Sequence, residues 1–334
     1  MVHMHKQQRR TKILIGSGVF LLVTSLTTDK SLLVHNRGAK AKSPTKRLFS
    51  CGYNLSVFNE EVLPEYEEVN FIASSPNVND VLVVGLHLGC PEAIRFPGKI
   101  VYVNGESYLP DGMDKLSLKE FYLGPVAPGQ GVWTQHMQLY YASIAVLTLR
   151  KAGSFEAFKQ RPKGTNAGFM LYTSSRCLEH RENALRLFSE IGEVSVAGSC
   201  HGNLQNYKRV IRKGPSWETG AEIYGNYKFG LVMENSDVPG YVTEKIVSAF
   251  IGGTIPIYYG TQDVFKIFNA RAFIYYNISN PESAVEQVRR LMNNSSAYRE
   301  MLNEPIATWQ QFQKFFSLKQ GGALTYEIRA FLRI

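Results

Sequence analysis

The segment 227–260 constrains the fold most, because its hydrophobic pattern changes twice within one short unit. Apolar residues alternate through 229–233, as in a buried strand, and a polar loop that ends in Pro-Gly follows at 234–240. The segment 241–251 then carries apolar residues on one helical face, and two glycines end it before the apolar, β-rich run 255–259. Strand, helix and strand in one sheet imply a parallel pair with a right-handed crossover.

The polar turn of this unit has the character of a phosphate site. Ligands of parallel sheets bind beyond the carboxyl ends of the strands, where a helix amino terminus offers free N–H groups and a partial positive charge. Lys245 lies in the predicted first helical turn, where a cation is normally unfavourable. Its presence there predicts an anion between the helix and the ammonium group, although a solvated surface lysine could occupy the same position.

Three segments of this unit, ENS at 234–236, YVTEK at 241–245 and GTIPIYYG at 253–260, resemble the donor signature of the α1,3/4-fucosyltransferase family. Members of that family are inverting enzymes that use GDP-fucose. The similarity runs from about 71 to 309 and is strongest across 171–305. It implies an α/β fold of two Rossmann-like lobes that face a central cleft, the GT-B arrangement, with GDP-fucose as the donor.

Composition limits the class of protein. The 334-residue chain is 44% hydrophobic and 19% charged, which is ordinary for a globular protein of two lobes. Its formal charge of +9 comes from the amino terminus, because residues 1–47 contain ten of the 37 basic residues and one of the 28 acidic ones, which leaves 27 of each for the rest. A neutral body argues against nucleic acid as a partner.

The amino terminus has the pattern of a membrane signal. Basic residues in 1–12 precede the uncharged, largely apolar run 13–28, which predicts a cytosolic tail and a signal anchor. The run is short for a span, which needs about 17–25 residues, so a cleaved signal peptide is the alternative. Residues 29–47 predict a flexible stem. The resemblance implies a single-pass type II protein of the Golgi membrane with a luminal catalytic body.

Glycosylation sites and cysteines are compatible with that compartment. Sequons begin at Asn54, Asn277, Asn293 and Asn294. The four cysteines, Cys51, Cys90, Cys177 and Cys200, allow one or two disulfides, but their pairing does not follow from the sequence and buried free thiols are the alternative. Their spacing matches no zinc site.

The rest of the chain predicts two α/β lobes. Strands expected at 80–85 and 99–104 belong to an amino-terminal, acceptor-side lobe over 48–152. A second series of strands and helices predicts a donor-binding lobe over 153–315, and a carboxyl-terminal segment, 316–334, follows.

The departing diphosphate of GDP-fucose requires stabilisation of negative charge. Many sugar transferases use a metal held by an Asp-x-Asp pair, and no such pair occurs in the chain. Fixed cations are the simpler interpretation: Lys245 as a point charge and Arg181 as a phosphate clamp, since Arg181 matches the family's phosphate-binding arginine. We therefore expect no required cofactor, no metal site and at most stimulation by a divalent metal. An ordinary surface arginine is the alternative for Arg181.

The resemblance also implies donor contacts from Asn235, Tyr241 and Glu244. Asn235 and Glu244 match family positions that contact the nucleotide part of the donor, and Tyr241 is expected to pack on it or bond to it. Glu244 has an alternative role, because a carboxylate at a helix amino terminus stabilises the helix by about 0.3–1 kcal/mol.

A general base is required on the acceptor side, because the attacking hydroxyl must lose a proton. Glu106 is the candidate: it follows the strand 99–104 at the end where ligands bind, and its segment resembles the one that carries the family's proposed base. A solvent-exposed loop glutamate is the alternative. His136 lies in another family-like segment and is interpreted as mainly structural.

The sequence therefore predicts an inverting glycosyltransferase that moves fucose from GDP-fucose to a glycan or glycoprotein hydroxyl, with α1,3 to N-acetylglucosamine as the expected linkage. Two alternatives remain, a twin-lobed transferase for another nucleotide sugar and a glycan-binding relative without catalysis. The first lobe matches the family poorly outside Glu106, so the acceptor is the least constrained part of the prediction.

Overall fold

The computed structural model describes residues 46–52, 58–85, 90–109, 117–125, 136–150, 154–211, 220–318 and 321–334. These residues belong to one compact unit that spans 44–334. The predicted tail, anchor and all but the last two residues of the stem lie outside the described ranges, so they stay predictions. Within those ranges, no helix has the length and apolar character to cross a membrane.

A first parallel sheet has the strand order β2-β1-β3-β4-β5-β6. Its strands are β1 (Lys46–Cys51), β2 (Tyr66–Glu68), β3 (Val81–Gly85), β4 (Lys99–Val103), β5 (Glu120–Gly124) and β6 (His136–Gln138). The order reverses between β1 and β3, which makes this a doubly wound sheet with its switch point there.

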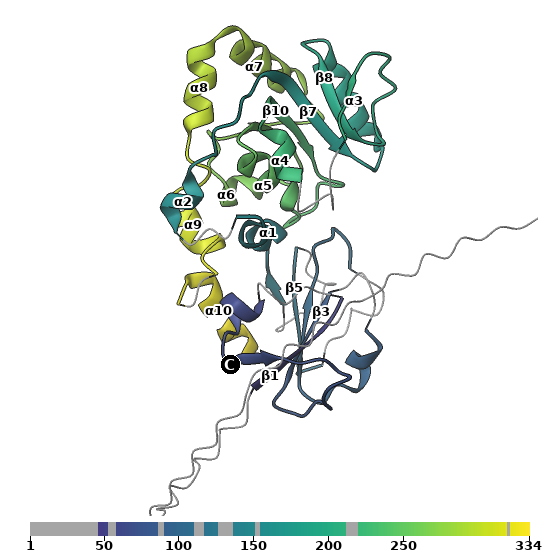
Figure 1. Cartoon of the computed structure of the whole chain (residues 1–334), viewed down its shortest axis with the longest axis vertical. Coiled ribbons are helices and arrows are strands. Elements are labelled where there is room, and N and C mark those ends of the chain that lie inside the picture. Colours follow the sequence, from purple (N-terminus) through teal and green to yellow (C-terminus); the bar gives the residue numbers. More distant parts are fainter. Residues whose placement is uncertain are drawn as a thin grey trace, which may run out of the picture. The chain divides into compact units, whose positions relative to one another are not determined.

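The second sheet, also parallel, has the order β12-β11-β10-β7-β8-β9. Its strands β7, β8 and β10 are labelled in Figure 1. Its strands are β7 (Gly168–Ser174), β8 (Val194–Gly198), β9 (Lys208–Arg209), β10 (Tyr227–Met233), β11 (Ile255–Tyr259) and β12 (Ile274–Tyr275). Counted from β7, this is the Rossmann order 3-2-1-4-5-6 read from the other edge. Its switch point lies between β7 and β10, where ligands of such sheets bind.

Helices connect the strands. They are α1 (Tyr141–Arg150), α2 (Phe155–Lys159), α3 (Glu179–Ser189), α4 (Gly220–Tyr224), α5 (Glu244–Ile251), α6 (Val264–Ile267), α7 (Glu282–Asn293), α8 (Ser295–Asn303), α9 (Trp309–Phe315) and α10 (Ala323–Leu332). A π-helical turn, Phe58–Val62, and a 3₁₀ turn, Pro91–Arg95, lie beside the first sheet.

Each sheet is apolar on both faces, as parallel sheets buried between helices are. On β7, Leu171 belongs to the cluster that packs with α5, and its neighbour Met170 belongs to the cluster that packs with α3 and α7. On β3, Leu82 and Val83 divide in the same way between the two clusters of the first sheet. The alternation of side chains along each strand thus builds two separate pairs of cores.

One helix, α1, packs partly on the other lobe from the one predicted, and another, α10, belongs to the carboxyl-terminal segment 316–334, which the prediction assigned to neither lobe. Ala142 and Val146 of α1 are buried in a core of the second sheet, and the Ala142 N–H donates to the Val242 carbonyl at 3.0 Å. Ile144 of the same helix is buried in a core of the first sheet, so α1 packs on both lobes, although the prediction placed it wholly in the first. Leu324 and Ile328 of α10 are buried in a core of the first sheet, beside which the helix is seen in Figure 1.

The unit 227–260 folds as strand, helix and strand, with β10 and β11 paired in parallel. The helix begins at Glu244, three residues later than predicted, because Thr243 is the extended N-cap residue and accepts a bond from the Lys245 N–H. Gly240 has a φ of +83°, and a β-carbon there would lie 2.3 Å from the Pro125 carbonyl oxygen. Glycine is therefore required where this loop meets the first sheet.

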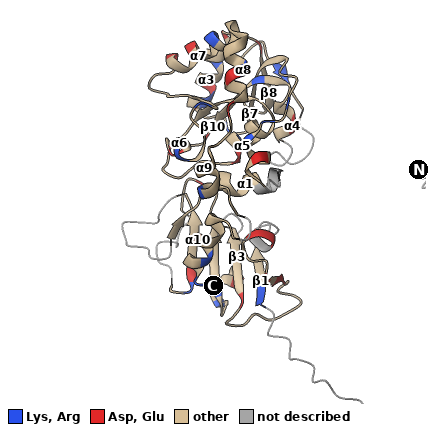
Figure 2. Cartoon of the chain, turned by 90° about the vertical axis from the view of Figure 1, so that its left-hand side faces the viewer, with Lys and Arg blue, Asp and Glu red and all other residues tan. Residues whose placement is uncertain are grey.

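All four cysteines are paired, Cys51 with Cys90 and Cys177 with Cys200. This agrees with the upper number of disulfides predicted and supplies the pairing that the sequence left open. Basic and acidic segments are interspersed over the described elements (Figure 2), as the neutral charge balance of residues 48–334 indicates.

Candidate active site

The carboxyl ends of β7 and β10 border a pocket of about 220 Å³ at the switch point of the second sheet. It is lined by Glu106, Thr173, Ser174, Ser175, Arg176, Arg181, Gly220, Tyr224, Asn235, Glu244, Lys245 and Ser248. Five of the six predicted site residues thus line one pocket. The sixth, Tyr241, is 1% exposed and bonds to two of them.

Glu234 is the buried anion of the site. It follows β10 directly and is completely buried. The Thr243 backbone N–H donates to Glu234 Oε1 at 2.8 Å, and the Thr243 hydroxyl lies 2.9 Å from both carboxylate oxygens. Burial raises the pKa of Glu234, and the charge of Lys245 acts against that rise. Glu234 was not predicted as a site residue, because a glutamate in a polar loop is normally expected to be solvated.

Lys245 is held by this carboxylate. Its Nζ lies 3.1 Å from Glu234 Oε2, 3.6 Å from Glu244 Oε1 and 3.0 Å from the Thr243 hydroxyl. Burial lowers the pKa of Lys245, but the two carboxylates outweigh burial and raise it well above its usual value. The anion predicted between the helix and Lys245 is therefore supplied by the protein itself. The position of Lys245 in the sequence alone was not proof of a bound phosphate.

Arg181 is 3% exposed, so it is not the surface arginine considered as the alternative. Its Nη2 donates to the Met233 carbonyl at 2.5 Å and to Asn235 Oδ1 at 2.7 Å, and its Nε donates to the Glu234 carbonyl at 3.3 Å. Its Nη1 donates to the Ser174 hydroxyl at 3.3 Å. Burial lowers the pKa of Arg181. These bonds fix the carboxyl end of β10 and use four of the five guanidinium N–H groups.

A chain of hydrogen bonds links the two sheets. Arg181 donates to Asn235, whose Nδ2 donates to the Tyr241 hydroxyl at 3.1 Å. The Tyr241 hydroxyl in turn donates to Glu106 Oε2 at 3.4 Å. The predicted phosphate clamp is therefore connected to the predicted base through two of the predicted donor residues.

Glu106 lies just beyond β4 of the first sheet. Buried Asn104 positions it, because Asn104 Oδ1 accepts from the Glu106 N–H at 2.8 Å while Asn104 Nδ2 donates to the Tyr122 hydroxyl at 2.8 Å. A β-carbon at Gly105 would lie 2.8 Å from the Tyr141 ring, so glycine allows the turn to pack against α1. The Glu106 side chain lines the pocket at the second sheet. A solvent-exposed loop glutamate would not.

Several pocket residues were missed by the sequence analysis. Arg176 lies two residues after β7, and Tyr224 and Ser248 face the pocket from α4 and α5. A β-carbon at Gly230 of β10 would lie 2.7 Å from the Tyr224 ring, so this glycine makes room for the tyrosine. The usable signal for Arg176 was its place after a predicted strand, at the end where ligands bind.

His136 packs in the first sheet, in agreement with a structural role. Its ring lies 5.3 Å from the Tyr122 ring, and Nε2 is 3.4 Å from the Gly124 carbonyl. Burial lowers the pKa of His136.

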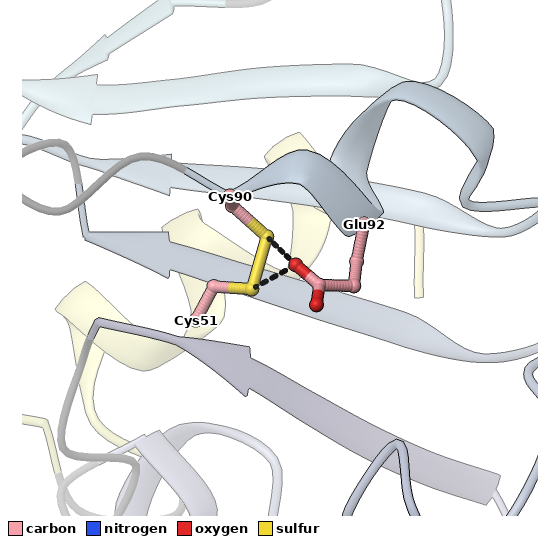
Figure 3. A group of neighbouring side chains, drawn as sticks. All are labelled: Cys51, Cys90 and Glu92. Carbon is pink, nitrogen blue, oxygen red and sulfur yellow. Dashed lines mark hydrogen bonds between the residues drawn. A yellow bond between two sulfur atoms is a disulfide. The ribbon is translucent and has the colours of Figure 1, made fainter.

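One group of three potential metal ligands is present in the described ranges, formed by Cys51, Cys90 and Glu92 (Figure 3). The two sulfur atoms form a disulfide, and Glu92 Oε2 lies 3.5 and 3.6 Å from them. Because a metal binds the thiolate, this group is not a metal site in its disulfide form.

Comparisons with known proteins agree with this geometry. The family profile "Glycosyltransferase family 10 (fucosyltransferase) C-term" matches residues 164–320. An α-(1,3)-fucosyltransferase of Helicobacter pylori is 40% identical over 26% of this chain and 19% of that protein. An α-(1,4)-fucosyltransferase of Arabidopsis thaliana is 28% identical over 42% of this chain and 38% of its own length. The chain thus spans less than two fifths of the length of the curated relatives that it matches.

The fold is that of a crystallised α1,3-fucosyltransferase. The superposition covers 89% of this chain and 91% of that protein, with a TM-score of 0.58 and 22% identity. A crystal structure of an α1,3-fucosyltransferase with GDP-fucose gives a TM-score of 0.55 at 21% identity, over 90% and 92% of the two chains. The family match covers the pocket-forming strands β7 and β10 of the second sheet. Residues 164–320 therefore form a glycosyltransferase family 10 (fucosyltransferase) domain.

Proposed function

We propose that the protein is an inverting glycosyltransferase that moves fucose from GDP-fucose to a glycan hydroxyl, in α1,3 linkage to N-acetylglucosamine. The observation that carries the proposal is one pocket lined by cationic and acidic side chains from both lobes. Arg176, Arg181 and Lys245 come from the loop and helices beside the second sheet, and the Glu106 carboxylate comes from the first lobe. The family match over residues 164–320 and the fold shared with a GDP-fucose complex support the donor.

The cations act on the leaving group. When the bond between fucose and GDP breaks, its electron pair moves to an oxygen of the terminal phosphate, and negative charge grows there. Lys245 lies in the first turn of α5, where the helix amino terminus adds to its positive charge. Its internal carboxylates hold Nζ in place, so little reorganisation is needed as the phosphate charge develops.

Glu106 acts on the acceptor. Its carboxylate takes the proton of the acceptor hydroxyl while the oxygen attacks the anomeric carbon, so a C–O bond forms as the bond to GDP breaks. Inversion requires the base and the leaving group on opposite sides of the sugar. A base on one sheet and the cations on the other support that arrangement.

Transfer to an acceptor array tests the activity. The purified protein is incubated with labelled GDP-fucose on N-glycan and lactosamine acceptors, and the product linkage is determined by NMR. An α1,3-linked product supports the whole proposal. An α1,4-linked product or transfer to a protein hydroxyl corrects only the linkage or the acceptor. Transfer from another labelled nucleotide sugar in place of GDP-fucose corrects the donor. Donor binding without transfer to any acceptor would instead indicate a glycan-binding relative without catalysis.

We also propose that no divalent metal is essential, because the chain has no Asp-x-Asp pair and gathers fixed cations in the pocket. Turnover in EDTA measures this. Stimulation by added metal is compatible with the proposal, whereas complete and metal-restorable loss of turnover would contradict it.

For location we propose the Golgi membrane, with a luminal body behind the amino-terminal anchor. Exposed asparagines at three sequons, Asn277, Asn293 and Asn294, support it, as do two disulfides, which persist in oxidising compartments. Expression in a glycosylating host should give a protein whose electrophoretic mobility changes with an N-glycosidase. An unshifted protein in the cytosolic fraction would overturn this placement.

A further inference from the structure

The three cations of the pocket differ in how the protein satisfies them. Lys245 is paired with Glu234 and Glu244. Arg181 gives four N–H groups to carbonyl, amide and hydroxyl oxygens of the protein. Arg176 is exposed, and its guanidinium makes neither an ion pair nor a side-chain hydrogen bond with any described residue. Of the three, Arg176 is thus the one with its full set of donors available to a ligand.

The backbone of Arg176 is fixed although its side chain is not. The Ser174 hydroxyl donates to the Arg176 carbonyl at 2.9 Å and accepts from the Arg176 N–H at 3.3 Å. The Leu178 N–H donates to the same carbonyl at 3.0 Å, and the neighbouring Cys177 is tied to Cys200 by a disulfide. A side chain on such a loop approaches a ligand from a defined point, which reduces the entropy lost on binding.

Arg176 also lies near a second cation. Its charge is among the causes that lower the pKa of Arg181, and the Ser174 hydroxyl that bonds the Arg176 backbone accepts from Arg181 as well. Two neighbouring guanidinium groups repel each other unless an anion lies between them. Their place at the carboxyl end of β7, at the switch point of a doubly wound sheet, is where a phosphate binds.

We propose that Arg176 is a donor-binding residue that contacts the diphosphate of the nucleotide sugar, and that it supplies more of the free guanidinium donors for this anion than Arg181 does. This inference rests on the proposed function, because it assumes a nucleoside diphosphate sugar as the ligand. Arg181 keeps one guanidinium N–H for the same anion and in addition holds the end of β10 and Asn235 in place.

Calorimetric binding of guanosine, GMP and GDP tests the assignment with Arg176→Ala, Arg176→Lys and Arg209→Ala. Arg209 is an exposed arginine at the end of β9 in the same sheet and does not line the pocket, so its variant removes the same charge elsewhere. We expect Arg176→Ala to weaken GDP binding about tenfold, the size of one charge-assisted hydrogen bond. Guanosine binding should be unchanged, GMP intermediate and the Arg209 variant normal.

Arg176→Lys should recover part of the affinity, because it keeps the charge without the planar fork. Equal GDP affinity in the wild-type protein and both Arg176 variants would overturn the inference and leave the proposed function standing. Equal loss for guanosine and GDP would also overturn it, since it would indicate damage to the whole site. Absence of GDP binding by the wild-type protein would overturn the proposed function and this inference with it.

Discussion

The two sheets share an architecture but differ in what they bury at their carboxyl ends. Both are six-stranded, parallel and doubly wound. The second sheet buries charge there, with Glu234 at 0% and Arg181 at 3% exposure. The first sheet buries the neutral Asn104 and leaves Glu106 half-buried. The difference indicates that one sheet is built around a fixed electrostatic site, whereas the other contributes one partly exposed carboxylate, that of the proposed base.

Burial of charge is costly unless each group is paired, and pairing requires exact neighbours. In the second sheet the paired residues come from short, continuous segments. The sequence of these segments is therefore recognisable, and the family profile covers it. On the first sheet, one carboxylate on one loop needs far less of the surrounding sequence to be fixed. This accounts for a strong resemblance across the donor side and a weak one on the acceptor side.

The largest expected effect separates catalysis from donor binding. Glu106→Gln keeps the size of the side chain but removes its ability to accept a proton, so we expect transfer to fall by about 10²–10⁴-fold. GDP affinity should stay near the wild-type value, because the phosphate cations belong to the other sheet. Glu67→Gln, an exposed change on β2, is the control. Near-normal transfer by Glu106→Gln would eliminate it as the base.

A buried ion pair in each sheet gives the next comparison. Glu234 pairs with Lys245 at the pocket, and Asp80, which is 1% exposed, pairs with Arg47 at 2.6 Å before β3. We expect Glu234→Gln and Asp80→Asn each to lower the free energy of unfolding by about 3 kcal/mol, since each removes the buried carboxylate of the ion pair. Only the Glu234 variant should also lose GDP affinity.

Urea unfolding and GDP titration on the same preparations measure both effects. A Glu234→Gln protein with normal GDP affinity would show that Lys245 keeps its position through Glu244 alone. The contrast between the sheets would then not extend to this ion pair.

The disulfides offer a matched pair of similar expected size. Cys177–Cys200 and Cys51–Cys90 close loops with sequence separations of 23 and 39, and chain entropy gives about 3 and 4 kcal/mol of stability for such loops. Replacement of either pair by serine should therefore destabilise the protein to a similar degree. Only loss of Cys177–Cys200, which lies beside Arg176, should weaken GDP binding in conditions where both variants are folded. Equal GDP affinity in the two variants would contradict a role for this loop in the donor site.

The sequence was sufficient for the elements whose patterns are local. The alternation in β10, the glycines after α5 and the apolar run of β11 each depend on neighbouring residues, so the unit 227–260 was predicted to within a few residues. The start of α5 was placed too early, since the N-cap role of Thr243 was not anticipated. Its side chain and backbone N–H bond to Glu234, nine residues away.

Contacts between distant segments could not be predicted. Glu234 looks like a solvated loop residue until the β10–α5 loop is folded over it. The amphipathic faces of α1 and α10 show that each helix packs on a core, but not on which one. The proposed role of Arg176 depends on its proximity to Arg181 and on its place in the pocket lining. Neither can be predicted from the spacing of residues along the chain.

The smallest expected effect tests the link between the two sheets. Tyr241→Phe removes the hydroxyl that accepts from Asn235 at 3.1 Å and donates to Glu106 at 3.4 Å. A hydrogen bond between neutral groups is worth about 0.5–1.5 kcal/mol, and the length of the bond to Glu106 weakens it to the same range, so transfer should fall about two- to tenfold.

A double-mutant cycle decides whether that loss acts through Glu106. If the Tyr241 hydroxyl only orients the base, Tyr241→Phe should cost nothing further in a Glu106→Gln background, because the proton-accepting group is already absent. Tyr298→Phe is the control, since its hydroxyl bonds the Lys228 carbonyl far from the pocket lining. An additive loss in the double variant would show that Tyr241 serves the donor side alone. The two sheets would then contribute to the reaction independently, each through its own residues.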